Sequence, residues 1–254
     1  MLANAPIFSD YLKINFTTWM AAMDDLNKFC GVLRRCMDDY GMIDEGDRVA
    51  VGVSGGKDSL LLLTALARLA RYYPKRYTLA AISCDLGFEG MDFAPVEALC
   101  GELGVPFILF DVRQEANPCS LCAKMRKGAL MNAAREAGCT KVALGHHFDD
   151  AAETVFMNLL FEGRLGCFAP VTHLDRSGMT QIRPMLYAGE QRIRQLVEKL
   201  ALPVVKTTCP MDCTSKRHEI KLLLAELSER YPDIKTKIFG AVQRAPLDGW
   251  EVRR

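Results

Sequence analysis

The sequence lacks both a long apolar run and a strong net charge. Its most apolar window, Leu60–Ala70, is interrupted by Arg68 and is too short to span a bilayer. The segment Met1–Pro6 has no basic stretch leading into an apolar one, so we expect no secretory signal and no membrane contact, and a cytoplasmic protein. The formal net charge of +1 excludes a global attraction to nucleic acid, so RNA binding would need a local basic face.

Internal repeats and low-complexity segments are also missing, whereas cysteine is plentiful. In a reducing compartment, the 10 cysteines favour metal or catalytic sulfur over disulfides. The chain has 254 residues, which predicts one large domain, or one domain and a small appendage. Its contents of 50% hydrophobic and 25% charged residues are typical of a soluble globular protein.

Short apolar strands alternate with helical patterns, which predicts an α/β fold with a parallel sheet and helices on both faces. We expect an N-terminal helical extension (1–46), a nucleotide-binding domain (47–206) and a C-terminal helical segment (207–254). Ligands of such sheets bind beyond the carboxyl ends of the strands. The expected strands are Arg48–Val53, Thr78–Cys84, Pro106–Asp111, Lys141–Gly145 and Thr180–Arg183. The expected helices are Thr18–Tyr40, Asp58–Tyr72, Phe93–Leu103, Leu121–Ala137, Asp149–Phe161, Gly189–Leu200 and two in 214–242, with Arg164–Gly178 as a loop and Leu202–Val205 as a last short strand.

A glycine-rich turn follows the first strand and opens a helix. Backbone N–H groups at such a turn suit an anionic phosphate, so we predict a nucleotide here. The ordinary P-loop has Ser or Thr directly after its lysine, but here Asp58 follows Lys57, which indicates a metal-bridged phosphate. A turn without a ligand is the alternative. The predicted nucleotide contacts in this stretch are Val53, Ser54, Gly55, Gly56, Lys57, Asp58 and Ser59, with Mg²⁺ on Asp58.

A second strand-to-helix turn reads Gly145-His146-His147-Phe148-Asp149-Asp150. Its histidines and carboxylates could contact ribose or phosphate, hold a metal or move a proton near neutral pH. A helix N-cap by Asp149 is the structural alternative. Around the same crevice we also predict nucleotide contacts from Asp85 and Arg183.

Cys119 and Cys122 open a helix after the third strand, so both thiols can face one ion or cluster. A thioredoxin-like redox pair and two structural cysteines have the same local spacing. The distant Cys209, followed by Pro210, supports an iron–sulfur cluster, whereas adding Cys213 would make a four-thiolate zinc site. The basic turn at residues 124–127 would overhang the nucleotide, although a solvated helix face also explains it.

The stretch from Ser54 to Ser59 is the signature of the PP-loop ATP pyrophosphatases, and further segments resemble the TtcA family of tRNA 2-thiocytidine synthetases. The resemblance covers about residues 26–244. It lies in residues 41–49 (GMIDEGDRV), 119–128 (CSLCAKMRKG), 144–150 (LGHHFDD), 182–185 (IRPM) and 230–232 (RYP). One departure is that Cys209-Pro-Met-Asp-Cys213-Thr-Ser stands where the family has Cys-x-x-Cys-Gly-Ser-Gln.

The resemblance implies ATP-dependent replacement of the 2-carbonyl oxygen of an anticodon-loop cytidine by sulfur. ATP would be cleaved between its α and β phosphates, leaving AMP on the substrate oxygen. A 4Fe–4S cluster would be held by Cys119, Cys122 and Cys209. Catalytic roles fall on Lys57, Arg126 and Asp150.

The implied partners are tRNA and a sulfur donor, such as a cysteine desulfurase or free sulfide, with a homodimer as an open possibility. Alternative functions are a 2-thiouridine synthetase, or a PP-loop adenylating ligase or small-molecule sulfur transferase that contains structural zinc.

Overall fold

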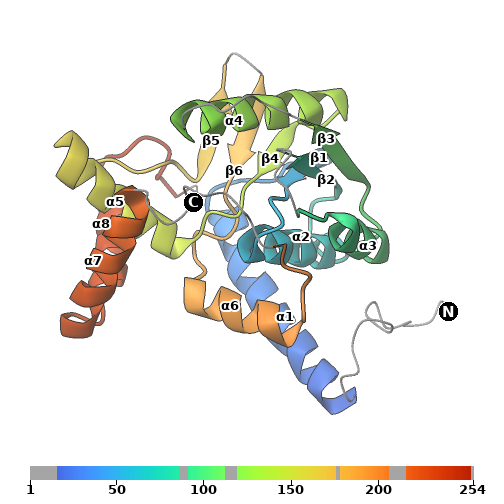
Figure 1. Ribbon diagram of the computed structural model, residues 1–254, viewed down its shortest axis with the longest axis horizontal. Helices are drawn as coiled ribbons and strands as arrows, with labels where there is room; N and C mark the ends of the chain where they lie inside the picture. Colours follow the sequence, from blue (N-terminus) through green and yellow to red (C-terminus); the bar gives the residue numbers. More distant parts are fainter. Residues whose placement is uncertain (1–15, 86–90, 112–118, 176–177, 206–215, 253–254) are drawn as a thin grey trace.

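A six-stranded sheet forms the centre of the molecule in the order β3-β2-β1-β4-β6-β5 (Figure 1). The computed structural model describes residues 16–85, 91–111, 119–175, 178–205 and 216–252; the side chains of residues 16 and 119–127 lie outside the description. All neighbouring strands are parallel except β5, which runs antiparallel to β6. The strands are β1 (Asp47–Gly52), β2 (Tyr77–Asp85), β3 (Phe107–Asp111), β4 (Lys141–Ala143), β5 (Val171–Leu174) and β6 (Met179–Ile182).

Helices cover both faces of this sheet, as the sequence predicted. Val49 and Val51 of β1 belong to the core shared with α1, α2, α3 and α6, whereas Ala50 belongs to the core under α4. Successive residues of a strand point to opposite faces, so the apolar run of β1 serves both layers. The helices are α1 (Phe16–Asp39), α2 (Lys57–Leu69), α3 (Ala94–Leu103), α4 (Cys119–Glu136), α5 (Phe148–Glu162), α6 (Glu190–Lys199), α7 (Lys216–Arg230) and α8 (Ile234–Arg244).

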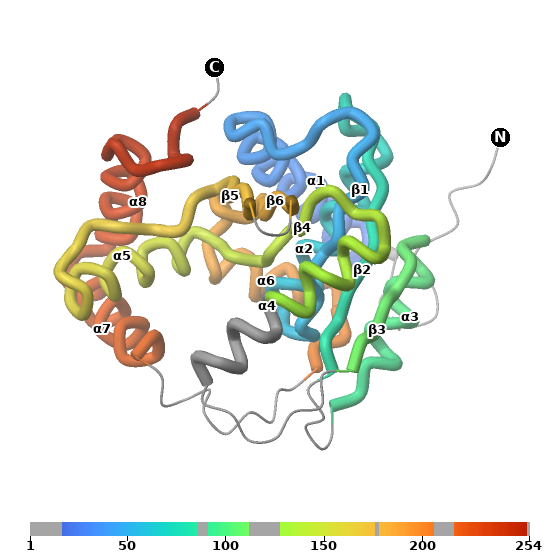
Figure 2. The backbone as a smooth tube through the Cα atoms, turned by 90° about the horizontal axis from the view of Figure 1, so that it is seen from above, coloured from blue at the N-terminus to red at the C-terminus, as the bar shows by residue number. Residues whose placement is uncertain are grey.

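Three helices lie beside the sheet rather than on it. Figure 2 shows α5, α7 and α8 grouped at one side, and α7 and α8 both pack on α5. Ile220 and Leu224 of α7 are buried with Ala152 of α5 in a small apolar cluster of their own. This packing brings the C-terminal helices next to the first turn of α5.

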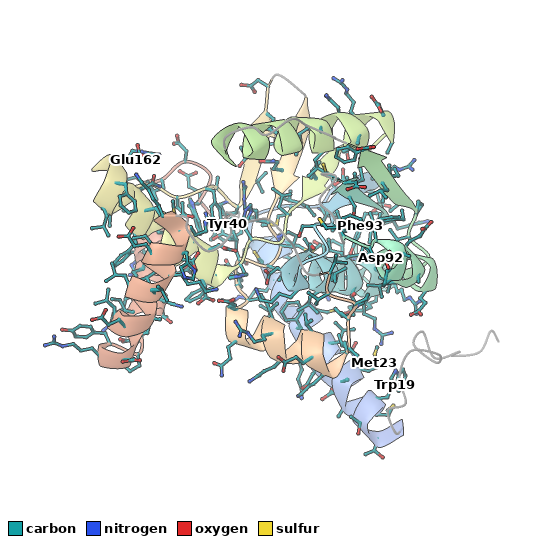
Figure 3. The ribbon with its side chains drawn as sticks, viewed as in Figure 1. Trp19, Met23, Tyr40, Asp92, Phe93 and Glu162 are labelled. Atoms are coloured by element: carbon teal, nitrogen blue, oxygen red, sulfur yellow. The ribbon has the colours of Figure 1, made fainter. Side chains whose placement is uncertain are left out.

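The helix α1 packs against α2 and α6 and contributes to the main core. Met23 is buried, and Trp19 packs against the same cluster near α6 (Figure 3). Among the described helices, none is long and apolar enough to cross a membrane. The boundaries of the three expected domains stay a prediction.

Two expected elements differ from the structure. The expected loop Arg164–Gly178 contains strand β5, an edge strand whose half-buried side chains give a weak apolar pattern. The expected strand Leu202–Val205 is irregular chain, and Pro203 within it has no N–H to donate to a neighbouring strand. Instead, the Val205 N–H donates to the Gly55 carbonyl at 3.0 Å, which places this segment against the glycine-rich turn.

Candidate active site

The turn after β1 is held in shape by its own hydroxyl groups. Ser59 Oγ accepts from the Ser54 N–H at 3.1 Å and donates to the Gly56 carbonyl at 2.9 Å. Gly55 has φ +80°, a conformation that favours glycine, and a Cβ there would stand 2.8 Å from Val205 Cβ. The turn is therefore fixed before any ligand arrives, with the first N–H groups of α2 left for an anion.

Val53 takes part in this turn through its backbone alone. Its N–H donates to the Ile82 carbonyl at 2.8 Å, and its carbonyl accepts from the buried Ser83 hydroxyl at 2.7 Å. Both backbone groups are thus committed to β2. Val53 anchors the start of the turn, and its side chain is buried in the core.

Lys57 and Asp58 begin α2 and face each other. Lys57 Nζ lies 3.0 Å from Asp58 Oδ2 and 3.3 Å from Glu190 Oε1. Burial acts to lower the pKa of Lys57, but the two carboxylates outweigh it and raise the pKa above its usual value. Asp58 Oδ1 is buried and accepts no hydrogen bond within the part of the chain that the structure describes. A carboxylate oxygen that accepts no hydrogen bond, beside the glycine-rich turn of residues 54–56 (the phosphate turn), fits the coordination of a divalent cation.

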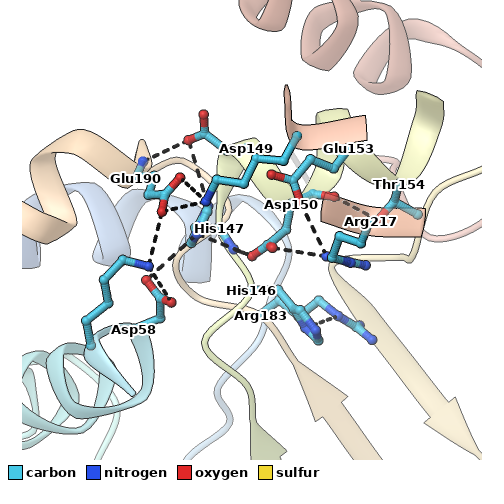
Figure 4. A network of polar contacts seen from close by, with 12 residues as sticks. Asp58, His146, His147, Asp149, Asp150, Glu153, Thr154, Arg183, Glu190 and Arg217 are labelled. Carbon is cyan, nitrogen blue, oxygen red and sulfur yellow. Dashed lines mark hydrogen bonds and ion pairs between the residues drawn. The ribbon is translucent and has the colours of Figure 1, made fainter. Parts of the chain in front are cut away.

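The second turn meets the first, as predicted. A Cβ on Gly145 would lie 3.1 Å from the backbone carbonyl carbon of Asp58, so glycine permits the close approach. His147 is buried, and its Nε2 lies 3.7 Å from Asp58 Oδ1 and 3.5 Å from Asp150 Oδ2 (Figure 4). The imidazole of His147 therefore stands between the carboxylates of α2 and α5.

Asp149 is engaged by two other helices. Its Oδ2 accepts from the Glu190 N–H at 2.7 Å and its Oδ1 pairs with Lys235 Nζ at 2.7 Å. Asp149 thus caps the N-terminus of α6 rather than that of its own helix, and it joins α5 to α8. A contact from Asp149 to a nucleotide stays a prediction.

Asp150 and Glu153 lie one turn apart on α5 and share a cation. Asp150 Oδ2 accepts from the His147 N–H at 2.9 Å, and Oδ1 lies 3.1 Å from Arg217 Nη1 of α7. The same Nη1 is 3.7 Å from Glu153 Oε2. Burial, with the nearby charge of Asp150, raises the pKa of Glu153 to about 7. A carboxyl group that exchanges a proton near neutral pH therefore stands beside the predicted catalytic carboxylate.

His146 turns away from this cluster towards Arg183. Arg183 Nε donates to His146 Nδ1 at 3.3 Å, and the guanidinium lies over the Phe168 ring, 4.9 Å from its centroid. Burial and the charge of Arg183 lower the pKa of His146 to about 4, and burial lowers the pKa of Arg183 to about 10. His146 is therefore neutral at physiological pH, and with Nδ1 accepting, its Nε2–H is the group that can donate.

The cysteine predictions fall partly outside the description. α4 starts at Cys119 after β3, at the carboxyl edge of the sheet where β2 ends at Asp85. The side chains of Cys119, Cys122 and Arg126 lie outside the described residues, as do Cys209 and Cys213 entirely. In the described ranges no group of three or more His, Cys, Asp or Glu side chains forms a metal site. Among the described cysteines, four are buried and form no disulfide: Cys30, Cys36, Cys100 and Cys139.

Four site residues were not found by the sequence analysis: Glu153, Glu190, Arg217 and Lys221. Glu153 could have been found, because it stands three residues after Asp150 and so shares its helix face. Glu190 and the two α7 cations have ordinary helical spacing, and only the fold brings them to the crevice.

Residues 28–222 match the PP-loop domain family. The chain belongs to this PP-loop family. It is 37% identical over 220 residues to the tRNA-cytidine(32) 2-sulfurtransferase of Syntrophotalea carbinolica, covering 82% of this chain and 85% of that protein. It is also 37% identical to the enzyme of that name from Geobacter sulfurreducens, covering 85% of this chain and 88% of that one. The resemblance predicted from the sequence is thereby confirmed.

A solved PP-loop structure agrees with this placement. The U34-tRNA thiolase NcsA from Methanococcus maripaludis, determined with its [4Fe–4S] cluster, superposes with a TM-score of 0.71 at 26% identity. The match covers 88% of this chain and 79% of that one. The predicted α/β fold is thus confirmed by a neighbour that matches most of the chain as well as by the sheet itself.

Proposed function

We propose that this PP-loop protein is an ATP-dependent tRNA sulfurtransferase that converts an anticodon-loop cytidine to 2-thiocytidine. The observation that carries the proposal is the likeness, over more than four fifths of the chain, to relatives named tRNA-cytidine(32) 2-sulfurtransferase. The contact between the phosphate turn and the His147–Asp150 turn supports this proposal. The residues that bind the phosphates during activation of the oxygen and the residues that assist its replacement by sulfur must lie in one crevice.

In the first half-reaction, the 2-carbonyl oxygen attacks the α-phosphate of ATP, and pyrophosphate leaves. The turn at Ser54–Gly56 and the start of α2 bind the phosphates, and Lys57 neutralises charge that develops on them. Asp58 would hold Mg²⁺ through its buried Oδ1, which fits because that oxygen accepts no hydrogen bond from a described residue. Mg²⁺ would polarise the phosphate oxygens and orient the leaving pyrophosphate.

In the second half-reaction, sulfide adds to C2 and AMP leaves with the former carbonyl oxygen. Asp150, which is held by the His147 N–H and by Arg217, would accept the proton of the incoming hydrosulfide. Arg126 would steady the phosphate of the departing AMP.

Cys119, Cys122 and Cys209 would hold a 4Fe–4S cluster. The donor set fits, because thiolates are the preferred ligands of iron–sulfur clusters and Cys119 lies at the N-terminus of α4, where the helix dipole favours an anion. With three protein thiolates, such a cluster keeps one iron free to bind sulfide.

A second candidate is 2-thiouridine synthesis, favoured by the likeness to a U34-tRNA thiolase. A cysteine desulfurase or free sulfide as the sulfur donor, a homodimer and a cytoplasmic location stay predictions from the sequence.

Mass spectrometry of tRNA nucleosides tests the proposal in cells with and without this protein. We expect 2-thiocytidine to disappear on deletion and to return with the wild-type gene, but not with the Lys57→Ala variant. Loss of 2-thiouridine alone would favour the second candidate. Unchanged thionucleosides would contradict both.

A further inference from the structure

Glu190 connects the phosphate turn to the C-terminal helices. It is the first residue of α6, where its N–H is held by Asp149, and its carboxylate lies 3.3 Å from Lys57 Nζ and 2.8 Å from Lys221 Nζ. The exposed Arg194 approaches it at 3.4 Å. Burial acts to raise the pKa of Glu190, but Lys221 and Lys57 lower it to about 2, so the carboxylate is charged under physiological conditions.

The helix α7 reaches the site at two points. Arg217 and Lys221 are four residues apart and therefore share a helix face. Arg217 pairs with Asp150 on α5, and Lys221 pairs with Glu190 on α6. The α7 helix is thus attached by charge to α5 and, through Glu190 of α6, indirectly to Lys57, in addition to its apolar contacts with α5.

Phosphates would compete with Glu190 for the same ammonium group. A polyphosphate bound at the turn carries more negative charge than one carboxylate, so it attracts Lys57 more strongly. Glu190 would then have only Lys221 and Arg194 as cationic partners. The attraction that holds Lys221, and with it α7, would increase.

We propose that Glu190 is a positioning residue shared by Lys57 and Lys221, so that nucleotide binding at the phosphate turn strengthens the docking of α7. The inference rests on the proposed function in taking ATP as the ligand of Lys57. It predicts that Glu190 orients Lys57 for the reaction while opposing, by its negative charge, the binding of the phosphates.

Hydrogen exchange of the α7 amides tests this coupling. The full-length protein is compared with and without Mg²⁺ and α,β-methylene-ATP, which cannot be cleaved between its α and β phosphates. We expect the analogue to slow exchange in α7 by about fivefold, the lower end of typical coupling between two sites. In Glu190→Gln we expect the analogue to bind at least as tightly but to leave α7 exchange unchanged. Glu198→Gln, an exposed change on the same helix, should behave like wild type.

Kinetics separate positioning from a structural role. Glu190→Gln should lower kcat by about tenfold without raising KM for ATP, because the loss falls on the transition state. A variant that is merely unfolded in part would lose kcat and ATP affinity together. Glu190→Asp, which keeps the charge, should recover part of kcat.

Lys221→Gln provides a second test that does not depend on the folding of a Glu190 variant. Without Lys221, Glu190 binds Lys57 more firmly, so analogue affinity should fall by about fivefold, and the Glu190→Gln/Lys221→Gln double variant should bind like Glu190→Gln alone. Additive effects, or slowed α7 exchange that persists in Glu190→Gln, would overturn the inference. A wild-type protein that does not bind the analogue would overturn the proposed function itself.

Discussion

At the scale of single residues, Asp58 distinguishes this phosphate turn from a kinase-like loop. One of its oxygens pairs with Lys57, and the other is buried without a hydrogen bond from any described residue. A charged oxygen left in this state is costly unless a ligand completes it. The carboxylate therefore favours a metal-bridged phosphate over a turn that is only structural.

Lys57→Ala and Asp58→Ala should each reduce turnover by about 100-fold or more, the usual loss when one positioned charge at a transferring phosphate is removed. Both side chains are partly exposed, so the fold should survive. Release of AMP and pyrophosphate measures turnover, and circular dichroism checks the fold. Lys28→Ala, an exposed change on α1, is the matched control. Turnover within a few-fold of wild type in either variant would remove this turn from the mechanism.

Glu153 should make stability depend on pH. Its side chain is 5% exposed, and burial raises its pKa from 4.5 to about 7. The folded state therefore binds a proton that the unfolded state has lost. This contribution of Glu153 to the free energy of unfolding is fully present below pH 4.5 and is lost as the pH rises through 7, a change of about 3 kcal/mol at most.

Urea unfolding at pH 5 and pH 7.5 measures this effect. Glu153→Gln should show a smaller fall in the free energy of unfolding between the two values than wild type does. Glu226→Gln on α7 serves as a control for the loss of one carboxylate. Equal pH dependence in wild type and Glu153→Gln would mean that Glu153 titrates normally.

At the scale of elements, the sequence predicted what local pattern controls. The two strand-to-helix turns were found because each is contiguous and has a chemical pattern of its own. The strand β5 was missed because an edge strand with half-buried side chains has little periodicity. The expected strand at Leu202–Val205 was wrong because apolar side chains alone do not distinguish a strand from irregular chain, and this segment contains Pro203 and packs against the turn at Gly55.

The site could be predicted only where its residues are neighbours in sequence. Lys57 and Asp58 were placed correctly beside the His147 turn, since both turns follow adjacent parallel strands. Arg217 and Lys221 could not be found, because their roles depend on how α7 packs against α5. Long-range packing of that kind leaves no mark on local composition.

The helix α4 gives a prediction about the cluster. It carries Cys119 and Cys122 in its first turn, and we expect Cys→Ser at either position, or at Cys209, to abolish cluster binding, with Cys213→Ser retaining it. A fourth thiolate would close the iron that must accept sulfide. Iron content and visible absorbance after anaerobic reconstitution are the measurements. Equal loss in all four variants, with zinc in the native protein, would indicate a structural four-thiolate site.

At the scale of the whole molecule, the candidate site and the apolar core lie at different parts of the sheet. The phosphate turn, the turn at residues 145–150 and the start of α4 lie at its carboxyl edge. The two apolar layers behind this edge hold these parts in position. The helices α7 and α8, which pack beside the sheet, contribute positively charged side chains to the crevice. The crevice is therefore assembled from segments across nearly the full length of the chain, so activity should require the intact molecule.

The contacts of Val205 and Arg217 have a consequence for the prediction that Cys209 is a cluster ligand. Val205 is bonded to the phosphate turn and Arg217 to Asp150, so the chain on either side of residues 206–215 is fixed at the crevice. A ligand linked to the same chain as its site acts at an effective concentration of about millimolar or more. We therefore expect the predicted recruitment of Cys209 as the third thiolate to cost far less entropy than binding a free thiol would. Arg217→Gln, which loosens one end, should weaken retention of the cluster although Arg217 is far in sequence from Cys119 and Cys122.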